Sequence, residues 1–409
     1  MTASSAAELI GLRAVLGLGA ALVMPATLST ITGTFPGEQR TRAASVWAAV
    51  ADGAAVLGVL ISGLLLEEWS WPSVFGLNVV LAAAIAGTIR FVPESADPKV
   101  PRVDIGGAIL AVLGMVALVY SIIEAPTEGW TSVRTLAGLA GGVVILAGFV
   151  DWALHRRAPL LDPRVFAQRS LAADGLSIFA QFFALFGLIF IVLQYLQLIR
   201  GDSGLLSAVS MLPMAAFLIP CARLAPALVA RLGARTVCTA GLILIAGALV
   251  VLAQLTAASG YWLLAVGLIP LGAGMGLATT PATSGITSAL PAAKQGVGSA
   301  LNDLSRETGG AVGIAVLASV LTATYQSHLS LAHVPAAEAS RARSSVAVAT
   351  RLGGTVTAHA QTAFTDGMHV ALLIAAGVVA AAAVTIALLM RQAAPQAQAE
   401  TLAVTTRSE

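Results

Sequence analysis

Eleven stretches of about 20 apolar residues follow one another along the 409-residue chain, and most charged residues collect in the short gaps between them. Only 10% of the residues are charged while 57% are hydrophobic, which is more apolar side chain than a water-soluble core of this length can bury. A helix rises about 1.5 Å per residue, so about 20 residues cross a hydrocarbon layer of about 30 Å. The pattern therefore predicts an all-α polytopic membrane protein.

The apolar stretches predict about 11 transmembrane helices. They are rich in Ala, Leu and Gly and lack the alternation of polar and apolar residues that a membrane β-barrel needs. The expected spans are residues 9–35, 44–66, 72–92, 105–125, 135–155, 171–199, 204–229, 236–256, 260–287, 297–324 and 367–390.

Lys and Arg indicate the sidedness, because cytoplasmic loops carry the excess of basic residues. Every second gap holds most of them, which predicts a cytoplasmic C-terminus and an inner (cytoplasmic) membrane location. An odd number of spans then places Met1 outside. This is unusual, since residues 1–9 contain neither a basic n-region nor a cleavage site. Either residues upstream are missing or the chain is atypical.

Two segments interrupt the helical pattern. Residues 157–170 contain two prolines and several arginines and are expected to form a cytoplasmic linker, whereas residues 326–366 are expected to form an external loop that can carry a surface helix. The five histidines show no metal-ligand spacing, Cys221 and Cys238 fall inside predicted spans, and no phosphate-cradling loop is present. No metal, cofactor, catalytic activity or nucleic-acid partner is expected.

Arg13 lies inside the first apolar stretch and is followed by Gly17, Gly19 and Pro25. A buried guanidinium costs at least about 2.5–3.5 kcal/mol at the bilayer midplane, so it should face protein or water, unless it snorkels from a helix end. This pattern resembles the fourth-span motif of drug:proton antiporters of the major facilitator superfamily, in which the arginine is implicated in proton transfer.

The resemblance continues through almost the whole chain, toward the 14-span efflux pumps for quaternary ammonium compounds and methyl viologen. Residues 51–63, with Gly58 and Gly63, look like the antiporter motif of the fifth span. Further matching segments are Trp71–Phe75, Gln194–Gln197, Leu212–Ala216, Ala230–Arg235, Pro281–Thr283 and Asn302–Gly310.

The resemblance implies that the first predicted span corresponds to the fourth span of the family, so that three spans are absent. It divides the chain into a partial N-terminal bundle (1–103), two linker helices (104–156), the cytoplasmic linker (157–170), a C-terminal six-helix bundle (171–390) and a cytoplasmic tail (391–409). The sequence also departs from the family at five positions, which are Val59, Ser62, Leu218, Ala230 and Ser284. Leu218 stands where some relatives carry an acid that contributes to dication recognition.

Asn302, Asp303, Arg306 and Glu307 lie at helical spacings that place them on one face of the tenth predicted span. Two carboxylates one turn apart repel each other, so one is expected to hold a proton near neutral pH unless Arg306 compensates. Such a pair can exchange a proton for a cation, and the resemblance implies acids at these positions. The alternative is a structural cluster that Arg306 neutralises.

Other residues carry weaker signals. Gly309 and Gly313 form a small-xxx-small face suited to close helix approach. Asp52 is equally consistent with a proton carrier and with a pore-facing solvated acid, and Asp174 reads as an interfacial residue near Arg169. Phe186, Phe190, Gln194 and Asn302 form a candidate pocket, although packing or lipid contact is favoured for the aromatics.

The sequence therefore predicts a secondary transporter that exchanges protons for lipophilic cations by alternating access between two bundles. Its partners would be protons, a small-molecule substrate and the lipid bilayer. The alternative is a truncated, non-transporting membrane protein or a fragment of a gene with a misassigned start.

Overall fold

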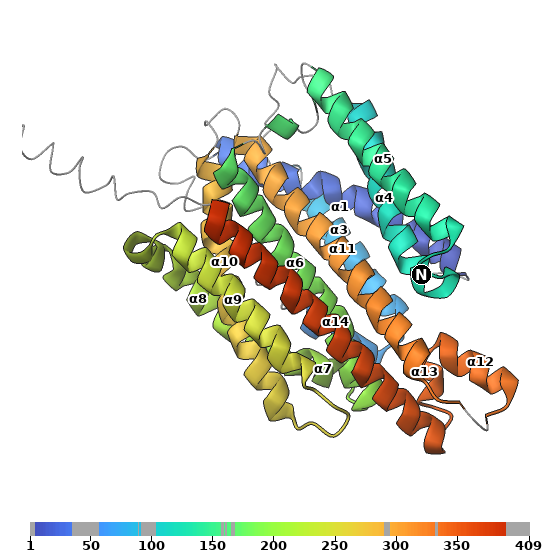
Figure 1. The fold of residues 1–409 in the computed structure, drawn as a ribbon. Helices are drawn as coiled ribbons and strands as arrows, with labels where there is room; N and C mark the ends of the chain where they lie inside the picture. Colours follow the sequence, from blue (N-terminus) through green and yellow to red (C-terminus); the bar gives the residue numbers. More distant parts are fainter. Residues whose placement is uncertain are drawn as a thin grey trace, which may run out of the picture. The chain divides into compact units, whose positions relative to one another are not determined.

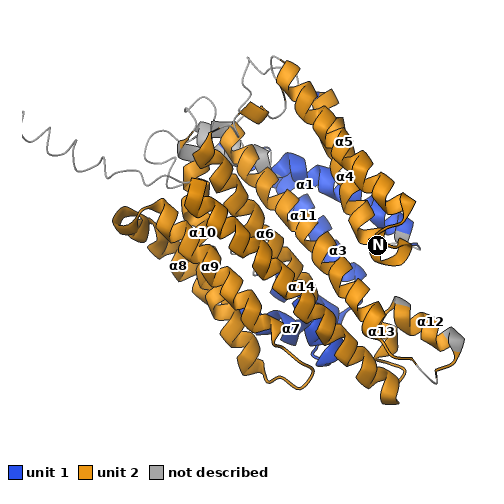
Figure 2. Ribbon diagram, in the orientation of Figure 1, with its two compact units in different colours: residues 1–104, 192–212 blue, residues 105–191, 213–409 orange. Residues whose placement is uncertain are grey.

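The computed structural model describes residues 5–34, 57–88, 90, 104–156, 159, 162–164, 168–289, 295–331 and 334–389. Its regular elements in these ranges are all helical. The chain divides into two compact units (Figure 2): residues 1–104 with 192–212, and residues 105–191 with 213–409.

Unit 1 contains the N-terminal helices and a short segment from the middle of the chain. A glycine contact joins these two parts: a Cβ added at Gly63 would lie 2.9 Å from the carbonyl oxygen of Gly204. Its elements are α1 (Ala6–Thr34), a helix over 57–68, α3 (Pro72–Thr88), the π-helical turn η3 (Tyr195–Ile199) and α7 (Gly204–Ser210).

Unit 2 contains the long helices of the middle and C-terminal parts of the chain (Figure 1). They are α4 (Ile105–Glu128), α5 (Val133–His155), α6 (Arg169–Gln194, except its last three residues), α8 (Leu212–Leu232, except its first residue), α9 (Ala234–Ala253), α10 (Tyr261–Ser288), α11 (Gln295–His328), α12 (Ala336–Ser344), α13 (Val346–Ala349) and α14 (Gly354–Leu389).

Capping groups set several helix ends. Ser132 precedes α5 and its side chain accepts a hydrogen bond from the Thr135 amide at 3.2 Å, which satisfies one of the free N–H groups of the first turn. Gly233 separates α8 from α9 with φ of 82°, a conformation that favours glycine. These local signals are readable in the sequence.

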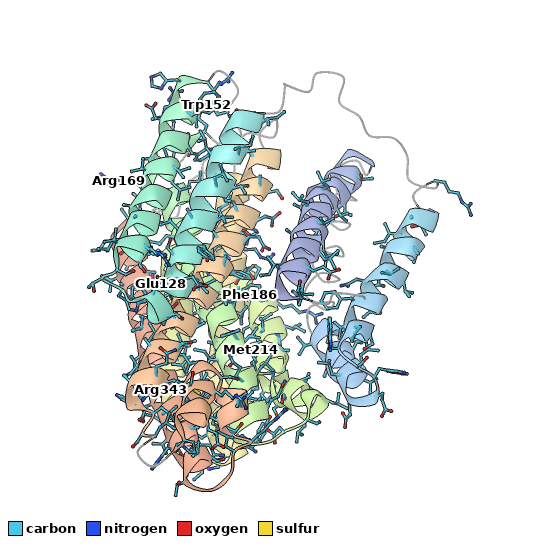
Figure 3. The ribbon with its side chains drawn as sticks, turned by 90° about the vertical axis from the view of Figure 1, so that its right-hand side faces the viewer. Glu128, Trp152, Arg169, Phe186, Met214 and Arg343 are labelled. Atoms are coloured by element: carbon cyan, nitrogen blue, oxygen red, sulfur yellow. The ribbon has the colours of Figure 1, made fainter. Side chains whose placement is uncertain are left out.

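Small residues allow α4 and α5 to pack as a tight antiparallel pair. A Cβ added at Gly114 would lie 2.7 Å from Cγ of Leu146, and one added at Gly142 would lie 2.7 Å from Cγ of Leu118. Glu128 marks the turn of this pair, and Trp152 lies toward its other end (Figure 3). Glycines at facing positions thus bring the two helices together, as is typical within membranes.

The interior of unit 2 is built from α6, α9, α10 and α14, with α11 packing against α14 and α4. Leu242, Ile245 and Leu249 of α9 are completely buried. A Cβ added at Gly241 would lie 2.7 Å from the carbonyl oxygen of Gly274, so the backbones of α9 and α10 are in near contact. The apolar interior therefore lies where small residues let the helices meet.

Eight helices within the described residues are long and apolar enough to cross a bilayer, and α3 is a shorter apolar helix. The prediction of an all-α polytopic membrane fold is confirmed. Predicted spans 9–35 and 72–92 coincide with α1 and α3, whereas residues 44–56 of the second span lie outside the described residues.

One predicted boundary is wrong, because the last helix begins at Gly354 rather than at residue 367. Helices α12 and α13 lie within the segment for which a loop carrying a surface helix was expected. Seven of the thirteen residues 354–366 are polar, so hydropathy marks only the more apolar portion of a longer helix. The span expected over 204–229 matches the apolar segment Gly204–Leu232, in which a one-residue turn at Met211 connects α7 to α8. The division into bundles inferred from the family resemblance stays a prediction.

Candidate functional site

The polar face predicted in the tenth span lies on α11, in unit 2. Asn302 is buried with 8% of its surface exposed, Asp303 and Arg306 are half-buried, and Glu307 is exposed. The Asn302 Oδ1 atom accepts a hydrogen bond from the Thr283 hydroxyl of α10 at 3.0 Å. Asn302 therefore links α10 to α11, while the carboxyls of Asp303 and Glu307 lie nearer the surface.

Arg306 is oriented by an aromatic ring. Its guanidinium carbon lies 4.6 Å from the ring centroid of Phe182 on α6, within the range of a cation–π interaction. Among the described residues, Arg306 makes no ion pair within 4.0 Å with Asp303 or Glu307. Arg306 thus forms no direct ion pair with either acid, although its charge acts on Asp303 from a greater distance. Whether the two acids exchange a proton or form a structural cluster with Arg306 stays a prediction.

Glycines bring this face of α11 against α6. A Cβ added at Gly313 would lie 2.7 Å from Cα of Phe183, and one added at Gly309 would collide with the Phe179 carbonyl oxygen. Between them, a Cβ at Gly310 would lie 2.9 Å from the Phe186 ring. The small residues therefore place the acids of α11 one or two turns from the aromatic side chains of α6.

The aromatic side chains of α6 form one stacked and one tilted pair of rings along the helix. The ring centroids of Phe182 and Phe186 are 6.0 Å apart, and those of Phe179 and Phe183 are 6.3 Å apart. Phe182 and Phe183 are buried, whereas Phe186 (Figure 3) and Phe190 are each 39% exposed. Gln194, at the end of α6, is half-buried. Exposed aromatic faces of this kind can bind lipophilic cations, so Phe186 and Phe190 remain a candidate pocket.

The predicted residues of unit 1 lie apart in sequence from this face. Arg13 is exposed, and its guanidinium carbon lies 5.2 Å from the ring centroid of Phe75. Added Cβ atoms at Gly17, Gly19 and Gly58 would meet no heavy atom of the described residues within 4 Å. The packing role of these glycines stays a prediction.

Two further predicted residues provide less information. Asp52 lies outside the described residues. Pro25 lies within α1, and its side chain is likewise outside what the structure describes.

Sequence reasoning missed a buried polar row that crosses three helices. Ser177 and Gln181 of α6 are completely buried, and Asp174 is 2% exposed. The Gln181 side-chain nitrogen donates to the Ser177 hydroxyl at 2.9 Å, and the Thr279 hydroxyl of α10 donates to Gln181 Oε1 at 2.6 Å.

The row reaches α9 through Cys238, whose Sγ lies 3.0 Å from the Ser177 hydroxyl. The interfacial interpretation of Asp174 is wrong, because packing by α9 and α10 removes it from solvent. The spacing of Asp174, Ser177 and Gln181 at i, i+3 and i+7 places all three on one helix face, and this signal could have revealed the row.

Metal-ligating side chains do not gather in the described part of the chain. No group of three or more His, Cys, Asp or Glu residues there is arranged to hold a metal ion. Cys221 and Cys238 are both free thiols.

The sequence is similar to a well-defined family and to drug-resistance proteins. The profile described as Major Facilitator Superfamily matches residues 1–314. The multidrug resistance protein Stp of Mycobacterium tuberculosis is 35% identical over 336 residues, which cover 80% of this chain and 62% of that protein. This chain thus corresponds to about 62% of the length of Stp.

Two other relatives are matched over more of their own length. The methyl viologen resistance protein SmvA of Salmonella typhimurium is 33% identical, with 86% of this chain and 72% of that protein covered. The multidrug efflux pump LfrA of Mycolicibacterium smegmatis is 31% identical, with 95% and 79% covered.

Solved structures support the same fold. A bacterial homologue of the human lysosomal transporter Spinster, in an inward-facing and unoccupied conformation, superposes with a TM-score of 0.55. The superposition covers 96% of this chain and 81% of the other chain, at 17% sequence identity.

Proposed function

This chain belongs to the Major Facilitator Superfamily, and we propose that it exports lipophilic cations across a membrane in exchange for protons. Transport of this kind needs no covalent chemistry, so the proposal includes no catalytic residue. The similarity to Stp, SmvA and LfrA, whose names describe drug resistance or efflux, supports the choice of substrate class. The observation that carries the proposal is the pair of acids on α11, neither of which forms an ion pair with Arg306.

Asp303 and Glu307 can couple proton entry to cation export, because their carboxyls lie one turn apart on the same helix. In a medium of low dielectric constant, two neighbouring carboxylates repel, so binding of one proton relieves the repulsion. A bound organic cation relieves the same repulsion. Proton and cation therefore compete for Asp303 and Glu307, which is the condition for exchange of one against the other.

The surrounding residues have supporting roles in this proposal. Phe186 and Phe190 offer exposed aromatic faces on the neighbouring helix, which favour flat lipophilic cations. Arg306, seated on Phe182, keeps a positive charge near the acids without occupying them. We place the chain in a cytoplasmic membrane with a cytoplasmic C-terminus, as the loop charges indicate.

Transport assays in everted membrane vesicles test the proposal. With an imposed pH gradient, the chain should drive uptake of ethidium, and the variants Asp303→Asn and Glu307→Gln should each reduce the pH-driven rate at least about tenfold. The matched control is Glu128→Gln, because Glu128 pairs with Arg134 at 3.2 Å on the exposed turn between α4 and α5. Unchanged pH-driven uptake in both acid variants would overturn the role of the pair.

A further inference from the structure

Asp174 is a buried acid that the proposed coupling pair does not use. It lies in the second turn of α6 in unit 2 and is 2% exposed. Its Oδ1 atom is inaccessible to solvent and has no hydrogen-bond partner among the described residues. Buried polar atoms in proteins are nearly always bonded, so this carboxyl calls for a physical explanation.

The backbone of α10 covers the carboxyl. A Cβ added at Gly285 would lie 2.7 Å from Cγ of Asp174 and would overlap its Oδ2 atom. The acid therefore occupies the space that a side chain at position 285 would fill. Glycine at this position allows α10 to close over Asp174.

No described charge compensates the carboxyl. Arg169 on the same helix is exposed and makes no ion pair with it within 4.0 Å, and neither does Arg235 at the start of α9. From α9 the buried thiol of Cys238 is the titratable neighbour, and it bonds to Ser177. α10 carries no Asp, Glu, Lys, Arg or His along its length. On α11 the charged groups are Asp303, Arg306 and Glu307, and Arg306 lies over Phe182.

An ionised carboxylate in such a place is strongly unfavourable, because burial removes its hydration and nothing described replaces it. The neutral acid avoids most of this cost. We propose that Asp174 is a second proton-binding site, occupied while α10 is closed over α6 at Gly285 and vacated when the two helices separate and water reaches the carboxyl.

The adjacent polar row makes this closed arrangement specific. Thr279 lies less than two turns before Gly285 on α10, and its bond to Gln181 fixes the register of α10 on α6. The Ser177–Cys238 contact fixes α9 against the same helix face. The row thus positions Asp174 rather than accepting its proton. The site adds a proton to the transport cycle proposed above but does not depend on which cation is exported.

Infrared spectroscopy of the purified protein in lipid tests the proposal, because a protonated carboxylic acid has a carbonyl band that a carboxylate lacks. We expect the double variant Asp303→Asn/Glu307→Gln to retain this band at neutral pH and to lose it when Asp174→Asn is added. Asp202→Asn is the matched control, since Asp202 has an ion-pair partner in Arg200 at 3.2 Å, which Asp174 lacks among the described residues. If adding Asp174→Asn leaves the intensity of the band unchanged, Asp174 does not hold the proton and the proposal is wrong.

A glycine pair tests the link to helix closure. Gly285→Ala should force α10 away from Asp174, admit water and remove the acid band at neutral pH, whereas Gly247→Ala on α9, which meets no described atom within 4 Å, should leave it intact. A band of full intensity in Gly285→Ala would refute the coupling to closure.

A labelling experiment replaces the substitution if Asp174→Asn fails to fold. Aspartate labelled with carbon-13 at its carboxyl must then shift the acid band of the Asp303→Asn/Glu307→Gln variant, and an unshifted band would exclude Asp174. None of these measurements involves export, so failure of the proposed transport would not affect them.

Discussion

The guanidinium of Arg306 lies over the ring of Phe182, 4.6 Å from its centroid, although two carboxyl-bearing residues are within one turn of Arg306 on its own helix. The contact joins α11 to α6. It keeps the positive charge close to Asp303 and Glu307 without an ion pair within 4.0 Å. In the function proposed above, this arrangement leaves the acids to bind a proton or a cation.

This contact should contribute measurably to stability. A double-mutant cycle of Phe182→Leu and Arg306→Gln should give a coupling free energy of about 1 kcal/mol, because a partly desolvated cation–π pair contributes about 0.5–2 kcal/mol. The coupling free energy is measured by chemical unfolding of the four proteins of the cycle in mixed micelles. A coupling energy near zero would show that the ring and the guanidinium act independently.

The close approach of α11 to α6 should be intolerant of one added methyl group. Gly313→Ala should lower the free energy of unfolding by about 1–3 kcal/mol, because the new Cβ would overlap the backbone of Phe183. Gly377→Ala on α14 should be neutral or slightly stabilising, since no described heavy atom lies within 4 Å of its added Cβ. Equal effects of the two substitutions in thermal unfolding would contradict the packing argument.

Replacing only one partner of the hydrogen bond between Thr283 and Asn302 should destabilise the protein more than replacing both partners. Thr283→Val leaves the buried Oδ1 of Asn302 without this donor and should destabilise the protein by about 1–3 kcal/mol. Adding Asn302→Leu should recover part of the loss. The control is Thr362→Val, whose hydroxyl is exposed and bonds to its own helix. A double variant less stable than Thr283→Val alone would count against this bond.

Unit 1 offers a separate test. Gly63→Ala should separate the helix over 57–68 from α7, because the added Cβ would lie 3.0 Å from Cα of Leu205 as well as against Gly204. Hydrogen–deuterium exchange of the amides of Gly204–Ser210 should become several-fold faster. Gly58→Ala, with no described atom within 4 Å, should leave the exchange unchanged. Protected amides in Gly63→Ala would argue against this contact.

Much of the fold was predictable because each segment that crosses a bilayer needs about 20 consecutive, mostly apolar residues. Most of the predicted spans match helices to within a few residues. The start of α14 is an exception with a local cause. Residues 354–366 extend this helix with a mixture of small and polar side chains, which hydropathy cannot distinguish from a loop.

The candidate site was predictable only in part. Helical spacing brought Asn302, Asp303, Arg306 and Glu307 to one face of α11, but spacing along one helix could not show which partner Arg306 selects. The choice of Phe182 over the neighbouring acids depends on α6. Asp174 illustrates the same limit, since its position near a helix start suggested the membrane surface, while α9 and α10 bury it.

Hydrophobicity and charge distribution by themselves determined that this chain is a set of membrane-crossing helices, because each depends on residues close together in sequence. The superfamily fold was implied by the resemblance of its ordered motifs to the family. Tertiary structure alone decided that Arg306 is held by a ring, that Gly285 closes over Asp174 and that Ser177, Gln181, Thr279 and Cys238 form one row. These relationships join residues as far apart in sequence as Phe182 and Arg306, and only the packing of helices brings such residues together.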